Sequence, residues 1–180
     1  DKVPFGSIHG RFQPFHNAHL AYAQAALRIA KRLYVGLTKI LTEHQIGADV
    51  APHRYEEMSN PLTYFQRVEI ITQALTSEGI PRERFEIGPF PVEVPNRLSE
   101  FWPKKNLCFT TIVDDWNIEK IRTLKEEGYE VVVLDDLNLK HLNIATGTEI
   151  RRLFRDKDQS WRLFVPSGVS SCLATHGWTL

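Results

Sequence analysis

The chain has 180 residues, of which 42% are apolar and 24% charged, with Lys+Arg and Asp+Glu equal at 22 each. This composition is typical of a globular protein with one buried core, and it excludes disordered and fibrous classes. A net charge of zero argues against a long nucleic-acid partner, which needs many basic side chains. Two distant cysteines, Cys108 and Cys172, and no apolar run of membrane-spanning length predict one cytoplasmic domain, residues 1–180, with no membrane partner.

Short apolar runs alternate with segments of helical periodicity, which predicts a parallel sheet with crossover helices. The expected strands are residues 4–9, 33–38, 85–90, 107–113 and 130–135. The expected helices are residues 18–32, 63–77 and 117–127, followed by two that begin near Thr148 and at Pro166. Two long segments, residues 39–60 and 91–105, interrupt this alternation, and loops of such length are usually functional or mobile.

The first unusual segment, residues 10–19, reads GRFQPFHNAH and joins the first strand to the first helix. Ligands of open α/β sheets bind at the carboxyl ends of strands, and a helix N-terminus attracts anions. His16 and His19 share one face of this turn, and with Arg11 they offer hydrogen-bond donors to phosphate oxygens. The alternatives are a structural histidine pair or, with His9, a zinc site; the zinc interpretation lacks a further ligand at a recognisable spacing.

The second unusual segment, residues 146–152, reads TGTEIRR. Thr146, Gly147 and Thr148 open a helix, and Arg151 follows one turn later, so backbone, hydroxyl and guanidinium groups can bind phosphate together. In the alternative interpretation, Thr148 is only a helix cap and Arg151 a solvated charge.

Together these segments resemble the HxGH nucleotidylyltransferase superfamily, and within it the archaeal type of nicotinamide-mononucleotide adenylyltransferase. The residues that carry the resemblance are 10–16, 60–68, 146–151 and 161–166, so it spans nearly the whole chain. The resemblance implies an α/β fold: a single doubly wound, Rossmann-like domain with a five-stranded parallel sheet of order 3-2-1-4-5. It also suggests a homo-oligomer.

The resemblance further implies a role for each matching residue. His16, His19, Arg11 and Arg151 would be catalytic, stabilising charge on the α-phosphate and the leaving pyrophosphate. The nucleotide would be bound by Gly10, Phe12, Gln13, Thr146, Gly147, Thr148 and Arg67. Mg²⁺ would be held mainly through triphosphate oxygens, with no dedicated protein ligand. Apart from the resemblance, the length and polarity of residues 43–60 and their position before the helix that carries Arg67 predict that this segment is mobile without ligand and closes over the triphosphate.

The acceptor side departs from the family pattern. Asn96 is kept, but Ser99 stands where the family has an aromatic residue that stacks on nicotinamide, so Trp102 is the expected substitute ring. Ala18 also replaces the glycine of HxGH.

These departures leave several functions open. The leading function is adenylyl transfer from ATP to nicotinamide mononucleotide, giving NAD and pyrophosphate. The alternative is adenylyl or cytidylyl transfer to another phosphate or phosphonate. A non-catalytic nucleotide sensor is more distant, and a metal-dependent hydrolase more distant still.

Overall fold

The computed structural model describes residues 1–40, 58–112 and 115–180. Its five strands form one parallel sheet of order β3-β2-β1-β4-β5, as predicted. The strands are β1 (Val3–Gly10), β2 (Ala30–Leu37), β3 (Phe85–Pro89), β4 (Leu107–Thr110) and β5 (Val131–Val133). Because β2 and β4 both pair with β1, the strand order reverses at β1, and a crevice opens beyond its carboxyl end.

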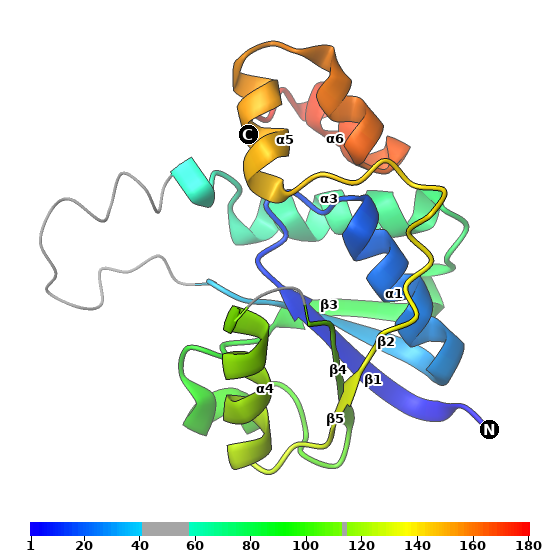
Figure 1. Ribbon diagram of the computed structural model, residues 1–180, viewed down its shortest axis with the longest axis vertical. Helices are drawn as coiled ribbons and strands as arrows, with labels where there is room; N and C mark the ends of the chain where they lie inside the picture. The colour runs from blue at the N-terminus through cyan, green and yellow to red at the C-terminus, as the bar shows by residue number, and fades with distance from the viewer. Residues whose placement is uncertain (41–57, 113–114) are drawn as a thin grey trace, which may run out of the picture.

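Helices cover both faces of the sheet (Figure 1). On one side lie α1 (Asn17–Ile29), α3 (Tyr64–Ser77), α5 (Gly147–Arg155) and α6 (Ser167–His176), and α4 (Asp115–Glu126) lies on the other. Three short 3₁₀ helices complete the described elements: η1 (Arg82–Arg84), η2 (Pro95–Glu100) and η3 (Gln159–Phe164).

Alternation along β1 divides its side chains between two hydrophobic cores. Ile8 belongs to the larger core, which packs β1 and β2 against α1, α3 and α6. Phe5 packs against the smaller core, whose buried members include Phe90, Trp102 and Leu124. His9, stacked on Phe90, therefore lies on the α4 side of the sheet.

Several element boundaries differ from the sequence prediction. The first helix ends at Ile29 and not at residue 32, because Ala30 is already extended and begins β2. The helix expected near Thr148 begins at Gly147, and its N-cap is Thr146. Pro166 is the N-cap of α6 and not its first helical residue. The prediction for residues 43–60 falls largely on residues 41–57, which lie outside the described ranges. No helix in the described ranges is long and apolar enough to cross a membrane.

Candidate active site

A cavity of about 540 Å³ lies at the carboxyl ends of β1 and β4, where the strand order reverses. On the helix side it is lined by side chains and backbone from α1, α5 and the segment before α5: His16, Ala18, His19, Leu139, Ile144, Thr146 and Gly147. On the α4 side it is lined by residues near the ends of four strands, β1 to β4, and by residues of α4: His9, Thr38, Val92, Thr111, Asn117 and Lys120. The cavity therefore has two walls of different chemistry.

Two helix N-termini meet at this cavity. His16 is the N-cap of α1, and Thr146 is the N-cap of α5, where its hydroxyl accepts the Glu149 N–H at 3.1 Å. A Cβ at Gly147 would lie only 3.3 Å from the Gln13 carbonyl oxygen and 3.0 Å from an Arg151 guanidinium nitrogen. Glycine thus lets the start of α5 approach the turn after β1. Both helix ends direct partial positive charge at the same space, which suits an extended polyphosphate.

The two motif histidines are coupled to each other. The backbone N–H of His16 donates to Nδ1 of His19 at 3.2 Å, and the rings stack with centroids 3.6 Å apart. Burial first, and then Arg151, lowers the pKa of His16 to about 4. Burial also holds the pKa of His19 well below its ordinary value, aided by His16, Lys120 and Arg11. Both rings are therefore neutral near pH 7. Because Nδ1 of His19 accepts a hydrogen bond, its proton lies on Nε2, which can donate.

Arg151 is buried and is not a solvated helix charge. The residue is 4% exposed, and its guanidinium group donates to the Gln13 carbonyl at 2.7 Å and to Thr148 Oγ1 at 3.2 Å. Burial and the neighbouring Arg11 and Arg155 lower its pKa to about 10, so it remains charged at pH 7. Arg151 joins the two phosphate-suited segments and places a cation beside His16.

Two residues expected to bind nucleotide have structural contacts. Arg67 is 2% exposed, and its guanidinium donates to the carbonyls of Arg11 (3.0 Å), Thr38 (2.7 Å) and Lys39 (3.1 Å). These three carbonyls accept from its two terminal nitrogens, whereas Nε has no hydrogen-bond partner among the described residues, so the role of Arg67 as a phosphate ligand stays a prediction. The Gln13 amide likewise pairs with both backbone groups of Leu62 at 2.9 Å, so this side chain clamps two loops together.

Phe12 also contributes through packing. Its backbone is in the left-handed region, with φ of 53°, and its ring is buried against Phe15 and the His19 ring. The ring packs against His19 and does not line the cavity, whereas Gly10 and Arg11, the two residues before Phe12, do.

The residues expected to bind the acceptor lie elsewhere. Trp102 is 3% exposed, and its ring stacks on Tyr34 with centroids 5.0 Å apart in the smaller core. Asn96 and Ser99 are exposed on η2, and none of the three lines the cavity. The stacking role predicted for Trp102 is corrected, because the large indole is more stable in the core under β1 and β2.

Sequence reasoning missed the α4 wall of the cavity. Lys120 is one of several charged residues on its helix, and the sequence indicates His9 only as a possible zinc ligand. Neither residue is therefore predicted to bind a substrate. The topology offered one signal, since the helix after β4 begins at the point where the strand order reverses.

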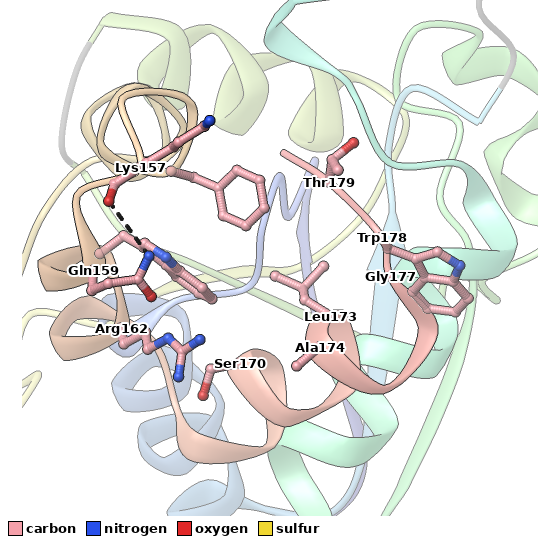
Figure 2. A pocket seen from close by; sticks show the side chains of 11 residues that line it. Lys157, Gln159, Arg162, Ser170, Leu173, Ala174, Gly177, Trp178 and Thr179 are labelled. Atoms are coloured by element: carbon pink, nitrogen blue, oxygen red, sulfur yellow. Dashed lines mark hydrogen bonds between the residues drawn. The ribbon is translucent and has the colours of Figure 1, made fainter.

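A second cavity, of about 380 Å³, lies between α5, η3 and α6 (Figure 2). Figure 2 shows Lys157, Gln159, Arg162 and Ser170 around it, with the Gln159 amide donating to the Lys157 carbonyl. None of the predicted site residues lines this cavity.

The described side chains of the cavity do not form a metal site. In residues 1–40, 58–112 and 115–180, no group of three His, Cys, Asp or Glu side chains could hold an ion. No carboxylate stands among the described residues that line the main cavity. The zinc interpretation of His9, His16 and His19 has no geometric support.

The sheet order and this site define the class of protein: a nucleotidyltransferase with a doubly wound fold. Residues 8–173 match the Cytidylyltransferase-like family, and the chain belongs to it. The chain is 33% identical, over 96% of its length and 91% of the relative's, to phosphonoformate cytidylyltransferase of Streptomyces viridochromogenes. It is 30% identical to nicotinamide-nucleotide adenylyltransferase of Saccharolobus solfataricus, over 91% of this chain and 86% of the relative.

Solved structures show the same fold. A bifunctional NMN adenylyltransferase/ADP ribose pyrophosphatase from Francisella tularensis superposes with a TM-score of 0.66 at 20% identity. The match covers 92% of this chain and 46% of that one, so this chain spans about half of the bifunctional protein.

Proposed function

We propose that the protein transfers a cytidylyl group from CTP to a small phosphonate acceptor of the phosphonoformate type and releases pyrophosphate. The observation that carries this choice is the position of Trp102. With its ring in the smaller core, the α4 wall presents His9, Asn117 and Lys120, which suit a small anion better than a nicotinamide ring. The relative that is 33% identical over nearly the whole chain carries the name of this activity.

The chemistry requires no strong general base. A phosphonate oxygen is already anionic near neutral pH and attacks the α-phosphorus of CTP in line. The new O–P bond forms while the bond to the β-phosphate oxygen breaks, and pyrophosphate leaves with the electron pair. The barrier lies in bringing anions together and in the charge that develops in the transition state.

Preorganised donors reduce this barrier. We assign to Nε2–H of His19 a hydrogen bond to the α-phosphate, and to His16 a second one. The N-termini of α1 and α5 and the cation of Arg11 face the rest of the triphosphate. Magnesium would enter as the complex of the triphosphate, because no described residue of the cavity supplies a carboxylate to hold it separately. Free, buried Cys108 and Cys172 fit the expected cytoplasmic setting.

Adenylyl transfer from ATP to nicotinamide mononucleotide is the second candidate. It is favoured by relatives of that name whose matches cover more than nine-tenths of this chain, such as the Thermococcus sibiricus protein at 28% identity. A non-catalytic sensor is weaker, because donors aimed at a transition state add little to ground-state binding.

A matrix of substrates tests the proposal. Purified protein is incubated with magnesium and each of CTP, ATP, UTP and GTP, paired with phosphonoformate or nicotinamide mononucleotide, and pyrophosphate release is measured. We expect the highest kcat/KM for CTP with phosphonoformate. Higher kcat/KM for ATP with nicotinamide mononucleotide would select the second candidate, and nucleotide binding without pyrophosphate release in any pair would select the sensor.

A further inference from the structure

His9 is a buried polar side chain without a polar partner. The residue is 2% exposed, and neither ring nitrogen has a hydrogen-bond partner within the described part of the chain. Such groups are rare in native proteins, because each loses its bonds to water on burial. His9 is nonetheless one of the residues that line the main cavity.

The surroundings hold this ring in one orientation. It stacks on Phe90 with centroids 4.3 Å apart and an interplanar angle of 18°. His9 pairs in register with Gly36 on β2, and a Cβ at Gly36 would lie 2.5 Å from Phe90 Cβ. Because Gly36 has no side chain, Phe90 can pack closely against β2, and the Phe90 ring packs against the imidazole of His9. This packing holds the ring in a fixed position at the cavity wall.

Lys120 supplies a positive charge on the same wall. It lies on α4, is 7% exposed, and lines the same cavity as His9. Its charge lowers the pKa of both His9 and His19, so the ammonium group lies near both rings.

We infer that His9 and Lys120 form the anion-binding subsite for the acceptor, on the α4 side of the cavity opposite the triphosphate. This inference rests on the proposed function, and it assigns selection of the acceptor substrate to these two residues. His16, Thr146 and Gly147 occupy the other wall with the two helix N-termini, so the two walls bind two separate anions. Lys120 offsets charge repulsion between them, and His9 donates one hydrogen bond to an acceptor oxygen.

The test separates acceptor binding from triphosphate binding. The variants are Lys120→Met, His9→Leu and His9→Gln; the controls are Lys125→Met, an exposed lysine on the same helix, and His176→Gln, an exposed histidine on α6. We expect Lys120→Met and His9→Leu to raise the KM for phosphonoformate about tenfold or more, as loss of a hydrogen bond to a charged group does. The dissociation constant for CTP, measured without acceptor, should change less than about threefold. Because glutamine can still donate, His9→Gln should recover part of the loss, whereas a purely packing role would not favour it over leucine.

Direct binding keeps the inference distinguishable from the proposed function. Phosphonoformate is titrated calorimetrically into wild-type and variant proteins whose folding is checked by circular dichroism. If wild type shows no transfer but binds phosphonoformate, and Lys120→Met abolishes that binding, the proposed function fails and the subsite stands. An unchanged KM and an unchanged binding constant in folded Lys120→Met and His9→Leu would overturn the subsite. So would a loss confined to CTP, which would assign both residues to the triphosphate.

Discussion

The backbone N–H of His16 donates to Nδ1 of His19 at 3.2 Å, so the second histidine caps the helix that the first one begins. This bond fixes the tautomer of His19 and leaves Nε2–H as its donor. A spacing of three residues thus has a catalytic and a structural consequence at once, and the two can be separated by substitution.

Replacing His19 tests its role at the α-phosphate. His19→Ala should lower kcat by about two to three orders of magnitude, as loss of an oxyanion donor does, with a smaller effect on CTP binding. Loss of the cap should cost about 1 kcal/mol of unfolding free energy. His19→Gln keeps an acceptor for the His16 N–H and should restore most of this stability. An unchanged kcat for the alanine variant at saturating substrates would contradict the assigned role.

Arg151 should matter for phosphate binding because it joins the two motif segments. Arg151→Lys keeps the charge but loses the fork that reaches both the Gln13 carbonyl and Thr148. We expect about a tenfold or greater loss in kcat/KM for the triphosphate. Arg152→Lys on the same helix, whose side chain is exposed and paired with Glu149 and Asp156, is the matched control. A large fall in melting temperature with normal kinetics would make Arg151 a structural residue only.

Replacing Arg67 should mainly lower the stability of the fold. Arg67→Met leaves three carbonyl acceptors without their donor, and we expect a loss of about 3 kcal/mol in the free energy of unfolding measured with urea. Because the turn after β1 and the end of β2 lose a common anchor, kcat/KM should fall as well. If stability were unchanged while triphosphate binding fell, Arg67 would be the phosphate ligand that the sequence resemblance implies.

Trp102 should act only through the core. Trp102→Phe should lower the unfolding free energy by about 1–3 kcal/mol, because the indole fills the smaller core against Tyr34 and Phe5. The KM for the acceptor, whichever of the two it is, should stay within about twofold of wild type. A tenfold rise in that KM alone would return Trp102 to the acceptor site.

Stability should fall at moderately acidic pH. The pKa of His16 is lowered from 6.5 to about 4, chiefly by burial, and those of His9 and His19 are lowered for the same first reason. Below pH 6.5 the unfolded chain binds protons that the native state does not, so the stability present above pH 6.5 is lost towards pH 4. Urea unfolding at a series of pH values should show this decline, and His16→Asn should make it shallower. An equal slope in wild type and His16→Asn would show that His16 does not contribute.

The sequence by itself determined the class of fold and the phosphate motifs. Those signals are local: the apolar periods of strands and helices, the glycines, and the residues that surround a helix N-terminus within a few positions of the chain. The parallel sheet agrees with that prediction, and its strand order agrees with what the family resemblance implied. Residues 10–19 and 146–151 lie together, since Arg151 donates to the Gln13 carbonyl.

Only the tertiary structure decided which polar and aromatic side chains line the cavity. Arg67 and Trp102 matched functional expectations in the sequence, yet distant partners bury both. His9 and Lys120 showed no comparable pattern, but the reversal of strand order at β1 brings them to one wall. Burial and hydrogen-bond partners come from distant segments, such as Arg151 and Gln13, which are 138 positions apart. A sequence pattern that spans a single turn carries no information about them.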